Sequence, residues 1–244
     1  MKKIGSVFFI LFWVAGIPGL VEAGIWSDIL KELPVAKSAE TASVPDQKTA
    51  VSGLREALVI GTENAVKALS KTDGYFSNPL VKIKLPDNIQ RVADVVARLG
   101  YQEQVDGLVL SMNRAAEAAA PKAIALFADA IKTLSIDDAR KIIQGGDTAA
   151  TQYFKDKTSE RLYDEFKPVV VSNMNKVGVA KAYKDMIAPY ETLPFVSKEA
   201  MDLDHYVTNK ALDGLFLVVA QEEQKIRTNP EARVTELLKT VFGN

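Results

Sequence analysis

The side chains with the greatest chemical potential form a polar cluster inside an alanine-rich segment, residues 111–120. Asn113 and Glu117 are four residues apart, and Arg114 and Glu117 are three apart, so all three share one side of a helix. The small neighbours would let another helix approach closely and leave the cluster partly buried. Because buried ionised groups need partners, the cluster is either a ligand-binding patch in a helical cleft or an internal ion pair that fixes helix register.

A second polar group directly follows the apolar run 215–219. Glu223 and Arg227 are four residues apart, in the order that favours an ion pair on a helix. Glu222 lies one turn from apolar residues on both sides, so it is a candidate to face inward. The charged side chains of this group form a solvated helix face in one interpretation. In the other, Glu222 and Arg227 belong to a ligand-binding site.

Two inward carboxylates would permit catalysis if they met. Glu117 and Glu222 would then form an acid and base pair or a metal site, and Arg114 would hold an anionic substrate. This arrangement requires a shared cleft and a raised pKa on at least one carboxylate. The sequence alone does not bring them together.

Other catalytic signatures are missing. There is no glycine-rich phosphate loop, no His-Glu-x-x-His and no Gly-x-Ser-x-Gly. The single histidine, His205, excludes a multi-histidine metal centre, and its acidic neighbours Asp202 and Asp204 are typical of a helix start. Gly145-Gly146 feeds another helix start, where Asp147 is placed to cap the helix and disfavours an anion. We therefore predict no metal and no cofactor.

The N-terminus has the pattern of a secretory signal peptide. Lys2 and Lys3 precede an apolar run at residues 7–15, and Val21-Glu22-Ala23 supplies small residues at the −3 and −1 positions of a cleavage site. The run is shorter than the roughly 20 residues that span a bilayer. We expect cleavage after Ala23 and export to a bacterial periplasm; an uncleaved signal would act as a weak anchor.

Composition narrows the class of the mature protein. Without residues 1–23 the chain keeps 221 residues, with 28 basic and 30 acidic side chains and a net charge of −2. This balance disfavours nucleic acid as a partner. The absence of cysteine excludes disulfides, thiolate metal sites and a lipid anchor on an N-terminal cysteine. No transmembrane span is expected after cleavage.

Periodicity predicts an all-α, bundle-like fold with a single domain. We divide the chain into a signal peptide (1–23), a lead-in and flexible linker (24–50) and one helical domain (51–244). Pro121 should kink or split one long helix near Ala120, and Ser135 with Asp138 forms a capping box. The predicted helices cover about 48–69, 87–99, 104–134, a short helix after Ser135, 148–166, 179–190, 198–228 and 230–242.

One segment has a strand-like pattern. Residues 81–85 alternate apolar and basic side chains at period two. The only candidate partner is Pro168-Val169-Val170-Val171, which begins at the proline expected to close helix 148–166. The sequence therefore allows at most a minor two-stranded ribbon. An extended loop is the favoured alternative.

Several of these segments resemble one family. Gly-Leu-Arg-Glu-Ala-Leu at 53–58, Met-Asn-Arg-Ala-Ala-Glu at 112–117, the Gly-Gly-Asp segment at 145–154, Ala-Leu-Asp-Gly-Leu-Phe at 211–216 and the ending through 243 are similar to the bacterial domain of unknown function 4197. The resemblance implies an exported protein of Gram-negative bacteria with a single domain. It carries no catalytic residues to this chain.

Three functions follow as hypotheses. The leading one is an exported helical module without catalytic activity that binds a protein or an envelope component through a groove or apolar patch. The second is a carboxylate-based hydrolase or lyase that uses Glu117 and Glu222 with Arg114. The third is an apolar-ligand carrier, which needs an internal cavity of several hundred cubic ångströms.

Overall fold

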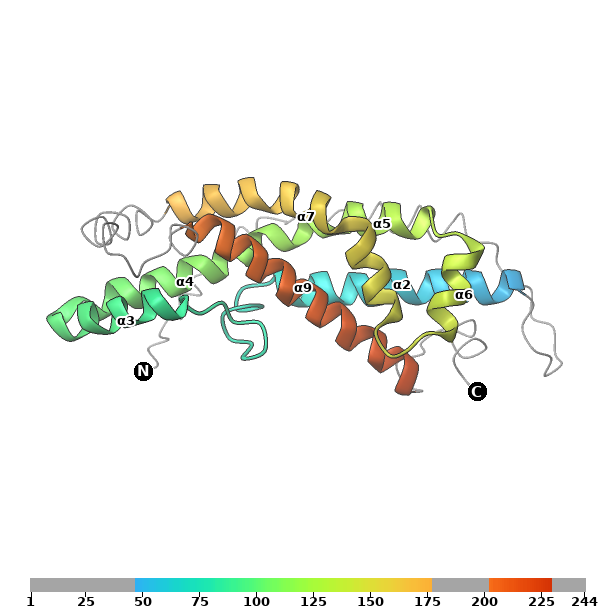
Figure 1. The fold of residues 1–244 in the computed structure, drawn as a ribbon, viewed down its shortest axis with the longest axis horizontal. Coiled ribbons are helices and arrows are strands. Elements are labelled where there is room, and N and C mark those ends of the chain that lie inside the picture. Colours follow the sequence, from blue (N-terminus) through green and yellow to red (C-terminus); the bar gives the residue numbers. More distant parts are fainter. Residues whose placement is uncertain (1–46, 177–201, 230–244) are drawn as a thin grey trace, which may run out of the picture.

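The described residues form an elongated bundle of helices (Figure 1). The structure is a computed structural model that describes residues 47–176 and 202–229. Its α-helices are α2 (Gln47–Ser70), α3 (Asp87–Val96), α4 (Gln102–Ala119), α5 (Ala123–Lys132), α6 (Ile136–Gln144), α7 (Ala149–Lys176) and α9 (Leu203–Thr228). Within these ranges there is no strand, so the predicted all-α class is confirmed.

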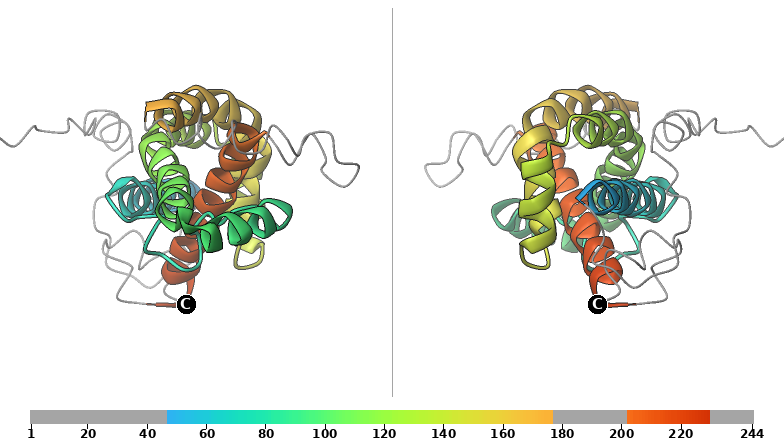
Figure 2. Two further views of the ribbon diagram at one scale, coloured as in Figure 1. Left: turned by 90° about the vertical axis from the view of Figure 1, so that its left-hand side faces the viewer. Right: turned by 90° about the vertical axis from the view of Figure 1, so that its right-hand side faces the viewer.

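The core lies where α2, α4, α7 and α9 surround a common centre, seen along the long axis in Figure 2. Small residues Ala115, Ala116 and Ala119 on α4 are completely buried, which lets α7 pack closely along this helix. Phe127 belongs to an aromatic cluster, and its ring centroid lies 4.8 Å from that of Phe154. The helices therefore enclose one hydrophobic core.

The predicted breaks fall where the sequence places them. A 3₁₀ turn at Ala120–Lys122 separates α4 from α5 at Pro121, as expected from the missing proline N–H. Ser135 and Asp138 form the predicted capping box of α6. At Gly100 the chain has a φ of 100° inside a π-helical turn, Ala97–Tyr101, which joins α3 to α4 as a helical hairpin.

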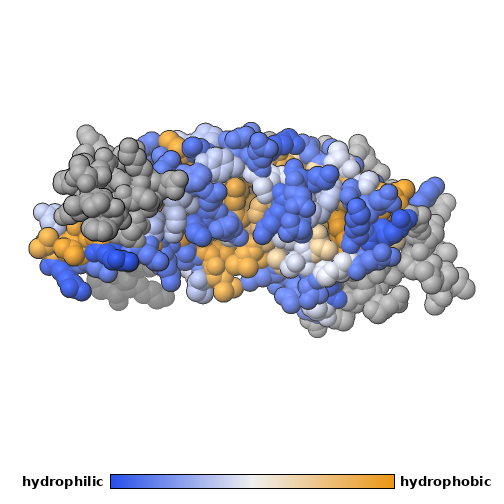
Figure 3. All heavy atoms as spheres, in the orientation of Figure 1, coloured by the Kyte–Doolittle hydropathy of each residue, from blue (hydrophilic) through white to orange (hydrophobic). Residues whose placement is uncertain are grey.

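This hairpin leaves apolar residues exposed at one end of the molecule, which is orange at the left of Figure 3. Leu99 is 72% exposed at the turn, and Val95 and Tyr101 are also exposed.

One expectation for the region around Pro168 is wrong. Helix α7 does not end before this proline but continues to Lys176, so residues 169–171 are helical and cannot pair with residues 81–85. Val170 and Met174 continue the buried stripe of Phe166 at four-residue spacing. Their burial outweighs the cost of about 3 kcal/mol for proline within a helix. Val81 belongs to a turn and residues 82–86 have no regular secondary structure, so this segment is a loop, as the favoured alternative predicted.

Several predictions lie outside the described residues. These are the signal peptide, the lead-in as far as residue 46, and the helices at 179–190 and 230–242. The division into signal, linker and domain stays a prediction. Helix α2 begins at Gln47, inside the predicted linker.

Candidate functional site

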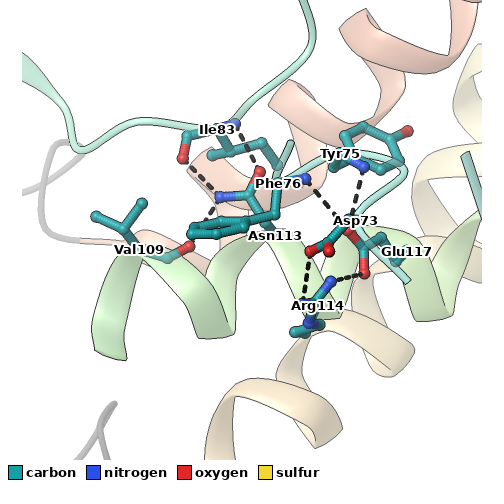
Figure 4. A network of polar contacts seen from close by, with 8 residues as sticks. All are labelled: Asp73, Tyr75, Phe76, Ile83, Val109, Asn113, Arg114 and Glu117. Carbon is teal, nitrogen blue, oxygen red and sulfur yellow. Dashed lines mark hydrogen bonds and ion pairs between the residues drawn. The ribbon is translucent and has the colours of Figure 1, made fainter. Parts of the chain in front are cut away.

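The loop between α2 and α3, residues 71–86, is the irregular segment that the polar cluster contacts (Figure 4). Its first turn contains Asp73, with a φ of 66°, and Gly74, where an added Cβ would lie 2.5 Å from the Leu69 carbonyl oxygen. Tyr75 then turns into the core, and its hydroxyl donates a hydrogen bond to the Ala211 carbonyl of α9 at 2.7 Å. Burial, and secondarily the charge of Glu117, raise the pKa of Tyr75 above its ordinary value.

Asn113 holds the middle of this loop through its backbone. The Asn113 side-chain oxygen accepts the Ile83 N–H at 2.8 Å, and its amide nitrogen donates to the Ile83 carbonyl at 2.8 Å. The same nitrogen donates to Val109 within α4. Asn113 is completely buried. Its amide therefore gives Ile83 the two hydrogen bonds that a neighbouring strand would give.

Arg114 and Glu117 hold the beginning of the loop. One Glu117 oxygen accepts the Tyr75 and Phe76 N–H groups at 3.1 and 3.2 Å, and the other accepts Arg114 at 2.7 Å. Arg114 also donates to Asp73 at 2.7 Å. The hydrogen bonds with Glu117 and then Asp73 raise the pKa of Arg114. This chain of contacts fixes loop and helix together, as expected for the internal ion pair.

The second predicted group divides into two separate arrangements. Glu223 accepts the Ala150 N–H at 2.9 Å and the Thr151 N–H at 2.9 Å, so it caps the start of α7, a role that the sequence assigned to Asp147. Arg227 binds Glu223 at 2.9 Å and donates to the Ile142 carbonyl at the end of α6. The predicted ion pair thus joins three helices.

Glu222, in contrast, binds residues near the surface. Its carboxylate accepts Asn64 of α2 at 3.2 Å and Lys225 at 2.5 Å. It shares no partner with Glu117. Tyr75, next to Glu117, reaches α9 at Ala211, and Glu222 lies about 16 Å further along this helix at about 1.5 Å per residue. The two carboxylates do not form one cleft in the described structure.

His205 lies at the predicted helix start. Asp202 accepts the His205 N–H at 2.9 Å and caps α9. The imidazole nitrogens contact the Tyr163 hydroxyl at 2.7 Å and the Asn209 amide at 3.0 Å. The ring therefore joins α7 to α9. Within the described ranges, no three His, Cys, Asp or Glu side chains lie close enough to hold a metal ion.

An open groove lies on the other side of the loop that Asn113 holds. It has a volume of about 270 Å³, and we call it the loop–α9 groove. It is lined by Leu80, Val81, Lys82, Ile83 and Lys84 of the loop and by Tyr206, Lys210, Asp213, Gly214 and Leu217 of α9. Leu80 is 64% exposed and Leu217 is 41% exposed. Figure 3 shows hydrophobic residues gathered on this face, where the loop meets α9.

Close contact between α9 and the loop shapes this groove. An added Cβ at Gly214 would lie 2.7 Å from the Tyr75 ring and 3.1 Å from Val81. The Tyr206 hydroxyl donates a hydrogen bond to the Lys84 carbonyl at 2.9 Å. Burial raises the pKa of Tyr206; the charge of Lys210 opposes this rise, and the charges of Asp87 and Asp213 add to it. Sequence reasoning singled out the alternation at 81–85 but not the groove, because its second wall comes from residues more than 120 positions away.

A smaller cavity lies between α2 and α9. It holds about 30 Å³ and is lined by residues that include Gly61, Thr62 and Ile226. Such a space is large enough for a water molecule. The cavity is far below the volume that a carried ligand needs.

Fold and site together define an all-α protein in which buried polar side chains organise one loop and the helix ends. The chain belongs to the family described as protein of unknown function DUF4197, whose model matches residues 44–243. The resemblance read from the sequence is thereby confirmed. No curated protein and no solved structure matches the chain significantly. None of the helices in 47–176 and 202–229 has the length and apolarity to cross a membrane.

Proposed function

We propose that this protein is an exported, periplasmic interaction module without catalytic activity, and that the loop–α9 groove is its binding surface. The observation that carries the proposal is the groove itself, where exposed Leu80 and Leu217 stand beside the basic side chains of Lys82, Lys84 and Lys210. Apolar residues that remain exposed in a rim of charge are typical of interaction sites. Envelope proteins are the partners that such a compartment offers.

The polar side chains of the cluster are hydrogen-bonded to other groups of the protein, which supports a binding role over a catalytic one. Glu117 accepts three hydrogen bonds from the loop and Arg114, and Asn113 is fully engaged with backbone groups. A general acid or base needs a proton that substrate can reach. In this arrangement the cluster serves to position the loop that forms the groove. Catalysis by Glu117 with Glu222 has no support from their separate surroundings.

Export rests on the N-terminal pattern and is tested separately. In cells that express the full chain, the protein should appear in the periplasmic fraction, and N-terminal sequencing should begin at Gly24. Full-length protein in the cytoplasm would contradict this part of the proposal.

Binding through the groove is tested by photo-crosslinking in cells. A photoreactive amino acid at position 217 should give a discrete crosslinked product that disappears in the Lys82→Glu/Lys84→Glu double variant. The same amino acid at exposed position 136, on α6, should give none. A product at 217 that is unaffected by the lysine substitutions, or no product, would refute this surface.

A further inference from the structure

We infer that the loop–α9 groove binds an extended, acidic peptide segment of a partner protein, which pairs as an added strand with the backbone of residues 82–84. The inference rests on the proposed function and names the chemistry and the binding mode of its partner. It begins from the two edges of the extended segment.

One edge of this segment is already occupied inside the protein. Asn113 binds both the N–H and the carbonyl of Ile83, which requires both groups to point toward α4. In an extended chain, adjacent residues direct their backbone groups to opposite edges. The groups of Lys82 and Lys84 therefore point away from Asn113. Tyr206, which lines the groove, accordingly reaches the Lys84 carbonyl.

The second edge offers one donor and one acceptor at the spacing that an added strand needs. The Lys82 N–H donates to Asn78 and the Lys84 carbonyl accepts Tyr206. The Lys82 carbonyl and the Lys84 N–H have no hydrogen-bond partner in the described part of the chain. A parallel partner strand satisfies both groups through its single residue opposite Ile83, and an antiparallel strand satisfies them through the two residues that flank that position.

The side chains around this edge define the chemistry of the partner. Three lysines, Lys82, Lys84 and Lys210, line the groove against one aspartate, Asp213, which already binds Lys210 at 3.1 Å. The Lys82 ammonium lies over the Phe76 ring, 4.1 Å from its centroid. Lys84 makes no ion pair within the described residues. Carboxylates on the peptide complement this excess of positive charge, and apolar side chains between them contact the exposed leucines.

The free backbone edge, and not the size of the groove, favours a peptide over a small molecule. A volume of about 270 Å³ lies at the lower end of the roughly 300–1,000 Å³ of most small-molecule sites. Strand addition instead draws its affinity from backbone hydrogen bonds and its specificity from alternate side chains.

The first experiment selects peptides without assuming their sequence. The mature protein, immobilised, is exposed to a display library of random twelve-residue peptides. Enriched peptides should combine acidic and apolar residues, and the best of them, labelled with fluorescein, should bind Lys82→Glu and Lys84→Glu at least about ten-fold more weakly. Lys132→Glu, at an exposed lysine on α5 that makes no ion pair within the described residues, serves as the charge control and should bind within about two-fold of wild type.

The second experiment separates backbone pairing from charge. Lys84→Ala removes only the side chain, whereas Lys84→Pro also removes the N–H that the peptide carbonyl would accept. Proline suits this position because the residue before it, Ile83, is already extended. The peptide should bind Lys84→Pro about three- to ten-fold more weakly than Lys84→Ala. Thermal unfolding of both variants verifies that the fold is kept.

Each other outcome overturns the inference in a defined way. Equal binding by Lys84→Pro and Lys84→Ala would exclude strand pairing. Enrichment of basic or neutral peptides, or no enrichment, would exclude an acidic peptide. Vesicles of anionic phospholipid that bind with the same dependence on Lys82 and Lys84, without peptide enrichment, would assign the groove to a lipid surface. If crosslinking at position 217 succeeds while the peptide tests fail, the proposed function survives and this binding mode does not.

Discussion

At the scale of single residues, Asn113 has the clearest energetic role. Asn113→Ala leaves the buried Ile83 N–H without its acceptor and the Ile83 carbonyl without its donor. We expect the free energy of unfolding, measured in urea, to fall by about 2–4 kcal/mol. Asn173→Ala is the matched control, because within the described residues that amide binds only Val169 of its own helix, and it should cost less than about 1 kcal/mol. Equal losses in the two variants would contradict the role of Asn113.

Gly214 is the residue that lets α9 approach the loop. Gly214→Ala places a methyl group against the buried Tyr75 ring, which has no room to move, and should destabilise the protein by about 1–3 kcal/mol. At Gly146 nothing lies within 4 Å of an added Cβ, so Gly146→Ala should be neutral or slightly stabilising. Thermal unfolding compares the two variants directly, and a stable Gly214→Ala variant would disprove the close contact.

Tyr75 makes stability depend on alkaline pH. Its pKa is raised in the folded state, so the folded protein binds a proton that the unfolded chain releases. Stability from this group is therefore complete below about pH 10, the ordinary tyrosine pKa, and falls above it by up to about 1.4 kcal/mol per pH unit. Urea unfolding between pH 9 and 11 should show a shallower fall for Tyr75→Phe than for the wild type. Tyr153 and Tyr206, also raised, account for the remaining slope.

Part of the site could be predicted from residue types alone. Alanines around Asn113 and Glu117 indicated that both would be buried, and both are. Their partners could not be predicted, because these are backbone groups 30 to 42 positions away, and a backbone N–H looks the same at every residue. For the same reason the sequence did not indicate that Glu223 caps α7. It favoured Asp147, which lies next to the start of this helix.

At the scale of elements, the Glu223–Arg227 pair determines how α6, α7 and α9 meet. Glu223→Gln removes the negative charge that Arg227 and the α7 N-terminus share, and should cost about 2–4 kcal/mol. Amide hydrogen exchange at residues 150 and 151 should accelerate in the same variant. Glu222→Gln, whose partners lie nearer the surface, is the neighbouring control and should cost less than about 1 kcal/mol. Similar costs for both variants would contradict this assignment.

Helices were predicted most reliably where their signals are local. The split at Pro121 and the Ser135 capping box depend on residues within one turn, and both are confirmed. The end of α7 was wrong because proline is a local signal that burial of Val170 and Met174 overrides. Helix propensity is a weak prior wherever tertiary packing competes with it.

At the scale of the whole molecule, charge is distributed unevenly. The full chain carries a net charge of −1, yet the lysines of the loop–α9 groove outnumber its carboxylates. Binding of the selected acidic peptide should therefore weaken several-fold between about 50 and 300 mM salt, because the Debye length falls below about 10 Å over this range. Fluorescence anisotropy measures this dependence. Binding that strengthens with salt would indicate an apolar contact in place of the charged one.

Because Asn113 binds the backbone of the loop, the residue that keeps the loop in place differs from the residues that determine what the groove binds. Asn113 contacts the peptide groups of Ile83 and makes no hydrogen bond to the side chain of half-buried Lys82, which lies over the Phe76 ring, or of exposed Lys84. A lineage can therefore exchange these two lysines and acquire a different binding preference while the scaffold keeps its stability. Among descendants of one ancestor, position 113 should stay fixed while positions 82 and 84 drift with the partner.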